Sequence, residues 1–375
     1  MHSLSPSTVD EVRAAVADTA GTHPRLLITG AGTAAGWGAP AAPADAIVDT
    51  TALSGVVKYA PADLTIAVLA GTPFTAIQQT LAEAGQRVAF DPARARHGAT
   101  VGGLLATADA GPLRTAFGSL RDLVIGTTVV LGDATVASSG GHVIKNVAGY
   151  DLAKLFHGSL GTLGVVAEVV LRLHPLPQAT STVAVDAGVA EAFELAGKIV
   201  MTGWEASALE WCDGRLLVKL EGTEAGVRQR EAEVCRLAGA SARALSDEEA
   251  ATAWESVAAV ADGGPNATVV RIGTLPAAGP AVVEKLASAT SSVAIGVHTA
   301  RFEGGDHDEL LARLHTEFGA AVTVLHREGL SDRSGWGPPP APVGVLRAVK
   351  RQFDPAGRFG AGRFTPWLEN EERAS

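Results

Sequence analysis

The chain has 375 residues, of which 47% are hydrophobic, and a formal net charge of −10 from 30 basic and 40 acidic residues. One hydrophobic core rarely grows beyond about 250–300 residues, so we expect two domains. The acidic balance argues against nucleic-acid binding, which needs a basic footprint. The two cysteines, Cys212 and Cys235, provide neither a disulfide framework nor a metal site, and this favours a reducing cytoplasm.

The N-terminal sequence MHSLSPSTVDEV lacks the basic and apolar regions of a signal peptide. The longest apolar runs, such as residues 64–71, are too short to span a bilayer. We therefore expect a cytoplasmic protein without direct membrane insertion. Any association with the inner face of the plasma membrane would be peripheral, through partner subunits.

A glycine-rich loop at residues 30–38 follows the first predicted strand, which covers residues 25–29. Such a loop offers unpaired backbone N–H groups to an anion. It lacks the Gly-Lys-Ser/Thr of a Walker loop. The segment 37–43 that follows has no helical pattern, which disfavours a Rossmann nucleotide site. Two interpretations remain for the loop alone: an anion-binding loop and a plain turn between strands.

The rest of the first half alternates short strands and helices. Thr8 and Glu11 form a capping-box pattern that opens a helix. His174 and the two prolines that follow it end this half and mark the predicted domain boundary. Between these points we expect strands at 46–53 and 64–70, a helix at 72–85, two strands within 123–140 joined at Gly132-Asp133, a helix from Asp151 and a strand within 158–166.

From Gln178 on, helical and strand patterns alternate, with a hairpin turn at Asp213-Gly214. This order predicts an antiparallel sheet with helices on one face, an α+β domain. The expected helices cover 188–200, 223–238, 246–260, 278–289 and 306–318, and the expected strands 208–211, 215–221, 267–273, 291–302 and 321–327.

Four sequence blocks lie in order in the first half: GATVGG (98–103), GPLRTAFGSLRD (111–122), KNVAGYDL (145–152) and GSLGTLGVV (158–166). Together they resemble the FAD-binding domain of the vanillyl-alcohol oxidase/PCMH superfamily. They are most similar to the FAD-binding subunit family (GlcE-type) of bacterial glycolate oxidases.

This resemblance implies an α+β fold with three parts. Residues 1–177 would form a PCMH-type FAD-binding domain of two subdomains, and residues 178–335 an α+β cap domain with an antiparallel sheet. Residues 336–375 would form a tail that returns to the FAD domain. The tail carries the pattern Lys-x-x-Phe-Asp-Pro-x-Gly-x-Phe-x-x-Gly-Arg-Phe at 350–364, which resembles the tail of the family.

The resemblance also implies the residues that bind FAD. Histidine, which bonds covalently to the flavin in some relatives, is absent from the loop at 30–38, so we expect non-covalent FAD. No metal site is expected. A positive charge at Lys145 near the ring would favour reduced flavin. The implied FAD-binding residues are Gly30, Ala31, Gly32, Thr33, Ala34, Ala35, Thr100, Val101, Gly102, Gly103, Thr107, Gly111, Phe117, Gly118, Lys145, Gly164, Val165 and Val166.

The activity implied is oxidation of glycolate, with D-lactate as a further substrate, to the 2-oxo acid by hydride transfer to FAD. The implied partners are a second FAD subunit and an iron–sulfur subunit. The His-x-Gly-Asp-Gly-Asn-x-His and Glu-His-Gly signatures of related hydroxy-acid dehydrogenases do not occur in this sequence, so the catalytic base is unknown. Two alternatives remain: a stand-alone FAD-dependent oxidoreductase for another 2-hydroxy acid or alcohol, and a non-catalytic FAD-binding scaffold.

Overall fold

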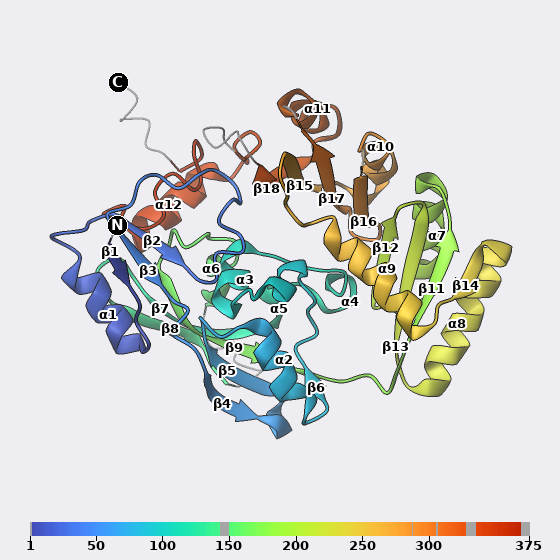
Figure 1. The fold of residues 1–375 in the computed structure, drawn as a ribbon, viewed down its shortest axis with the longest axis horizontal. Helices are drawn as coiled ribbons and strands as arrows, with labels where there is room; N and C mark the ends of the chain where they lie inside the picture. Colours follow the sequence, from blue (N-terminus) through green and yellow to red (C-terminus); the bar gives the residue numbers. More distant parts are fainter. Residues whose placement is uncertain (1, 143–149, 287, 305–306, 328–334, 369–375) are drawn as a thin grey trace. The chain divides into compact units, whose positions relative to one another are not determined.

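The computed structural model describes residues 2–142, 150–286, 288–304, 307–327 and 335–368 (Figure 1). They fall into two units. The first combines Met1–Ala110, Ser119–Leu176 and Asp332–Ser375, and the second combines Gly111–Gly118 and Pro177–Ser331. The sequence predicts that the segment 111–118 belongs to the FAD-binding domain, whereas in the structure it clusters with the second unit. The reason is local, because its short helix α4 (Arg114–Phe117) packs against strand β12 (Ala208–Cys212) of that unit.

Three sheets form the framework of the first unit. The largest is antiparallel with the order β4-β5-β9-β7-β8, a second is parallel with the order β1-β3-β2, and β10 pairs with β6. Their bounds are β1 His2–Leu4, β2 Leu26–Thr29, β3 Ala46–Asp49, β4 Val56–Ala60, β5 Thr65–Leu69, β6 Gln86–Arg87, β7 Val124–Val130, β8 Val136–Gly140, β9 Val165–Arg172 and β10 His174–Pro175.

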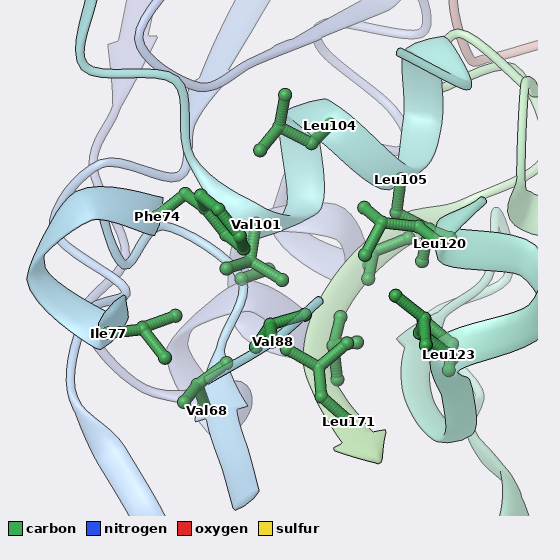
Figure 2. Close-up of a cluster of buried hydrophobic side chains, with 14 of the residues drawn as sticks. Val68, Phe74, Ile77, Val88, Val101, Leu104, Leu105, Leu120, Leu123 and Leu171 are labelled. Carbon is green, nitrogen blue, oxygen red and sulfur yellow. The ribbon is translucent and has the colours of Figure 1, made fainter. Parts of the chain in front are cut away.

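The helices of the first unit lie on both sides of the five-stranded sheet. On one side, apolar residues of α2, α3 and α5 pack against strands β5 and β9 (Figure 2). Phe74, Ile77 and Leu81 are buried because their spacing places them on one face of α2. The helix bounds are α1 Val9–Asp18, α2 Phe74–Ala82, α3 Val101–Thr107, α5 Leu120–Leu123, α6 Ala153–Phe156 and α12 Val343–Phe353.

The other side of that sheet packs on α1 and the parallel sheet. Val165 and Ala167 of β9 pack with Val12 and Val16 of α1, whereas Val169 packs on the other side of the sheet. The β7–β9 register shift between Thr128 and Val129 interrupts the alternation of side chains along β9 between these positions. Thr8 caps α1 as predicted, accepting a hydrogen bond from the Glu11 N–H at 3.1 Å. The central strands β5, β9 and β7 are therefore buried on both faces of the sheet.

The second unit contains one eight-stranded antiparallel sheet, ordered β14-β11-β13-β12-β16-β17-β15-β18. This confirms the predicted α+β class. Its strands are β11 Ala179–Asp186, β12, β13 Arg215–Gly222, β14 Ala242–Ala244, β15 Ala267–Gly273, β16 Ser288–Ser292, β17 Val297–Glu303 and β18 Ala321–Arg327. Its longer helices are α7 Val189–Met201, α8 Glu224–Ala238, α9 Asp247–Ala259, α10 Gly279–Val283 and α11 Asp308–Phe318.

Helices cover both faces of this sheet, not one as predicted. Leu209 of β12 belongs to the core beside α7 and α8, and Cys212 of the same strand belongs to the core beside α9. Helices α10 and α11 pack on the continuation of the first face, over Val270 and Ala300. On the sheet face that carries Cys212, helix α9 covers strands β11, β12 and β13.

One predicted strand and one predicted helix were wrong. Residues 291–302 form the end of β16, a turn and β17, and α10 ends at Val283 instead of 289. The turn is required by Gly296, whose φ is +65° and whose position would bring a Cβ to 2.3 Å from the Thr274 carbonyl oxygen. The alternating pattern at 291–302, which predicted one strand, comes from two short strands that follow one another in the sequence.

Among the residues that the structure describes, no helix has the length and apolar character needed to cross a membrane.

Candidate functional site

The loop after β2 presents backbone donors with no partner among the described residues. The Ala35 N–H donates to the Gly32 carbonyl at 3.1 Å, but five consecutive N–H groups before it donate to no acceptor in the described chain. They belong to Gly30, Ala31, Gly32, Thr33 and Ala34. Consecutive free N–H groups in a turn form a concavity that binds anions. The loop therefore suits the diphosphate of a dinucleotide cofactor.

Two buried arginines donate hydrogen bonds to backbone carbonyls of this loop. Arg94 donates through Nε to the Thr33 carbonyl at 2.8 Å, and Arg363 donates through Nη1 to the Ala35 carbonyl at 2.6 Å. Because the C=O and N–H of one peptide unit point in opposite directions, the bond to the Thr33 carbonyl turns the Ala34 N–H away from Arg94, and the bond to the Ala35 carbonyl holds the end of the loop. Burial lowers the pKa of Arg363 to about 10, so it stays charged at neutral pH.

Arg363 is positioned by Trp336, whose ring belongs to an aromatic stack in the tail. Trp336 donates through Nε1 to the Arg363 carbonyl at 2.8 Å. Its ring stacks on Phe364 and packs on Trp367, both at 5.0 Å between ring centroids. Gly38 lies so close to Trp336 that a Cβ there would be 2.3 Å from the indole. The tail is thus held against the end of the loop.

Replacing Arg363 by methionine is expected to weaken FAD binding about tenfold or more, because the loop loses a charge-assisted hydrogen bond that orients its backbone. The measurement is a titration of FAD by fluorescence quenching. Arg351→Met is the matched control, since Arg351 is exposed on α12. Equal FAD affinity for Arg363→Met and the wild type would contradict this role.

Helix α3 lies beside the loop but contributes no free donors. A Cβ on Gly30 would lie 2.6 Å from the Thr100 hydroxyl, so the two segments are in contact. The N–H groups at the start of α3 are all bonded: Val101 to Thr72 O, Gly102 to Ala70 O and Gly103 to Thr100 Oγ1. The N–H groups of Val101, Gly102 and Gly103 are therefore engaged within the chain, Thr100 lies against the loop, and contact of residues 100–103 with FAD stays a prediction.

The segment 158–162 packs against the other end of α3. Gly158 and Leu160 donate their N–H groups to the carbonyls of Leu105 and Ala106, at 3.0 and 2.7 Å. Between them the Ser159 hydroxyl is buried and has no partner among the described residues. A buried hydroxyl without a partner costs free energy unless a ligand satisfies it. Ser159 is thus a further candidate cofactor contact, which our sequence analysis missed although it lies within GSLGTLGVV.

Four other predicted residues lie in the first unit. The Thr107 hydroxyl donates to the Gly103 carbonyl at 2.8 Å, within α3. Gly164 is crowded, since a Cβ there would lie 2.9 Å from the Val130 carbonyl oxygen. The side chains of Val165 and Val166 are buried in the two cores on either side of the sheet. Any contact of these two valines with a cofactor would therefore involve their backbone.

The remaining predicted residues are elsewhere. Gly111, Phe117 and Gly118 belong to the segment of the second unit around α4. Their contact with FAD stays a prediction. Lys145 lies outside the described residues.

The described residues include no group of three His, Cys, Asp or Glu side chains that could hold a metal ion. Neither cysteine favours its thiolate form. Burial raises the pKa of Cys212 to about 12, and burial also raises the pKa of Cys235. Nucleophilic thiolate chemistry at these two residues is therefore disfavoured.

Comparison with known proteins finds similarity over the part of the chain that contains this loop. Residues 2–140 match the family described as "FAD binding domain", which includes the loop and α3. Glycolate oxidase subunit GlcE of Escherichia coli is 34% identical over 224 residues, which cover 60% of this chain and 62% of that protein. The mitochondrial D-lactate dehydrogenase [cytochrome] 1 of Saccharomyces cerevisiae is 31% identical over 173 residues, covering 46% of this chain and 29% of that protein.

Some of the matches extend over nearly the whole chain. An uncharacterized FAD-linked oxidoreductase of Mycobacterium tuberculosis is 24% identical and covers 96% of this chain and 90% of that protein. The solved structure of alkyldihydroxyacetonephosphate synthase has a TM-score of 0.71 at 15% identity, covering 96% of this chain and 75% of that one. The latter similarity shows the fold alone. The chain therefore carries an FAD-binding domain at its N-terminal end, followed by an α+β domain with an antiparallel sheet.

Proposed function

We propose that the chain is an FAD-dependent oxidoreductase that oxidises small 2-hydroxy acids, and that it acts as the FAD-binding subunit of a glycolate oxidase complex. The observation that carries the proposal is the row of free N–H groups at Gly30–Ala34, inside the region that matches the FAD binding domain. The substrate class rests on the similarity to glycolate oxidase subunit GlcE and to D-lactate dehydrogenase.

The chain's own residues would bind and orient the cofactor. The loop N–H groups would hold the diphosphate, with Arg94 and Arg363 keeping the loop in place. Thr100–Gly103 and the Ser159 hydroxyl would contact the same cofactor. Bound FAD would supply the acceptor for the hydride that leaves the substrate α-carbon.

The proposed partners are a second FAD subunit and an iron–sulfur subunit that carries electrons onward. The proposed location is the cytoplasm, with peripheral contact to the plasma membrane through these partners. A second candidate is a stand-alone oxidoreductase. It is favoured by the nearly full-length similarity to a single FAD-linked oxidoreductase of Mycobacterium tuberculosis.

Anaerobic addition of glycolate or D-lactate to the FAD-loaded chain tests the substrate class, with flavin absorbance as the measurement. Bleaching by either acid is expected, in the chain alone or after its native partners are restored. Co-purification of the tagged chain with a second flavoprotein and an iron–sulfur protein would support the subunit role. Bleaching by the lone chain without any such partner would favour the stand-alone candidate. No bleaching in either preparation would contradict oxidation of these acids.

A further inference from the structure

The second unit contains a buried arginine whose hydrogen-bonding capacity is only partly used. Arg327 is the last residue of β18, and its side chain is 6% exposed. Its Nη2 donates to Oδ1 of Asp308 at 2.9 Å. Its Nε and Nη1 are buried and have no partner among the residues that the structure describes. A buried donor without an acceptor costs free energy, so both nitrogens would gain from an acceptor that a ligand supplies.

Helix α11 starts beside this guanidinium and presents further donors. Its first residue is Asp308, which binds Arg327. The N–H groups of Glu309 and Leu310 donate to no acceptor in the described part of the chain. His307, which precedes the helix, makes no capping hydrogen bond with its side chain. The N–H groups at a helix N-terminus carry partial positive charge and bind anions. The guanidinium and the helix therefore offer donors of the same sign at one place.

The ends of two strands complete the surroundings of this guanidinium. Strands β17, β15 and β18 are neighbours at one end of the eight-stranded sheet (Figure 1). The register places Phe302 and Arg327 on either side of Thr268, so the three side chains share one face of the sheet. Leu311 of α11 belongs to the same core as Phe302, and the rings of Phe302 and His307 lie 4.7 Å apart between centroids. Strands β17 and β18 and the start of α11 thus meet around Arg327.

The charges at this place favour an anion with a single negative charge. The side chain of Asp308 is 42% exposed, so a ligand can approach from solvent there. Its carboxylate balances the charge of Arg327, and Glu309 beside it is exposed. Glu303 of β17 is paired with Arg301 at 2.8 Å. A doubly charged anion would be repelled by Asp308, whereas a carboxylate carries one charge and its two oxygens match the N–H groups of a guanidinium.

We propose that the second unit binds a small monocarboxylate at the start of α11, held by Arg327 and by the N–H groups of Glu309 and Leu310. The ligand accepts hydrogen bonds from the guanidinium and from the helix, and Asp308 selects against doubly charged anions. All of these groups lie within Pro177–Ser331. This binding therefore needs neither FAD nor the loop at Gly30–Ala34, and it does not depend on the proposed function.

The test is calorimetry on the full chain, prepared without and with FAD, at pH 8 and constant ionic strength. The probes are acetate and glycolate, which carry one charge, and inorganic phosphate, which is mainly doubly charged at this pH. Arg327→Met removes the guanidinium. Arg313→Met is the matched control, since Arg313 also belongs to α11 but is exposed and paired with Glu317. Near-identical circular dichroism of the variants establishes that they are folded.

We expect the wild type to bind acetate and glycolate with and without FAD, and phosphate more weakly. The affinity for acetate should fall about tenfold or more in Arg327→Met and stay unchanged in Arg313→Met. Wild-type affinity for acetate in a folded Arg327→Met, or no saturable binding of either acid by the wild type, would overturn the proposal. Neither result affects FAD binding or flavin reduction, which test the proposed function separately.

Asp308→Asn provides a second variant whose expected effect is a gain. The amide oxygen of asparagine can still accept from Nη2 of Arg327, while the negative charge beside the ligand is removed. The affinity for phosphate should therefore rise about tenfold and approach or exceed that for acetate. A damaged fold would not produce such a gain, so this variant decides the matter even if Arg327→Met fails to fold. An unchanged preference for acetate over phosphate in Asp308→Asn would contradict the site.

Discussion

Replacing Asp354 by alanine is expected to lower the free energy of unfolding by about 3–5 kcal/mol, because it leaves a buried ammonium without its counter-ion. Asp354 is 2% exposed and accepts three hydrogen bonds. Lys350 Nζ donates at 2.6 Å, and the N–H groups of Arg358 and Phe359 donate at 2.9 and 2.8 Å. Burial lowers the pKa of Lys350, against the effect of Asp354, which raises it.

The same variant should also weaken FAD binding, since Asp354 organises the tail that carries Arg363. Arg358 extends this network by donating to the carbonyls of Val16 and Gly132, at 2.9 and 2.8 Å. Urea unfolding and an FAD titration measure the two effects. Asp151→Ala is the control, because its ion pair with Lys154 is exposed and such pairs contribute about 1 kcal/mol or less. A loss below about 1 kcal/mol for Asp354→Ala would contradict the role of this network.

The second unit is expected to lose up to about 3 kcal/mol of stability as the pH falls from 6.5 toward 4, because of His298. Burial lowers the pKa of His298 to about 4 from the usual 6.5. In this pH range the unfolded chain binds a proton that the folded chain does not. The stabilisation by neutral His298 is therefore fully present above pH 6.5 and is lost progressively below it.

His298→Gln should remove this part of the pH dependence, since glutamine has no proton to gain in this range. Urea unfolding of the wild type and the variant at pH 7.5 and pH 5 measures it. Trp204, Trp211 and Trp254 report on this unit by fluorescence. We expect the wild type to lose more stability than His298→Gln between the two pH values. An equal loss in both would show that His298 does not titrate as its burial predicts.

The elements predicted best from the sequence are those whose structure is determined by a local residue pattern. Helices with an apolar face, such as α2, and the loop after β2 were found from spacing and glycine content alone. The turn at Gly296 was missed because β16 and β17 are short and adjacent, so their combined pattern looks like one strand. The α+β class followed from the order of elements and did not depend on this error.

Contacts between distant parts of the chain could not be predicted in the same way. Arg94 and Arg363 hold the loop from 61 and 328 residues away, and no local pattern distinguishes them from surface arginines. Ser159 became a candidate only when its hydroxyl was seen to be buried without a partner.

The most direct test of this account is the visible absorption spectrum of the purified full chain after incubation with FAD and removal of unbound cofactor. We predict a flavin spectrum, with all of the FAD released into solution when the protein is denatured, because the proposed attachment is non-covalent through the Gly30–Ala34 loop. A chain that retains no flavin would contradict the cofactor assignment on which the proposed function rests.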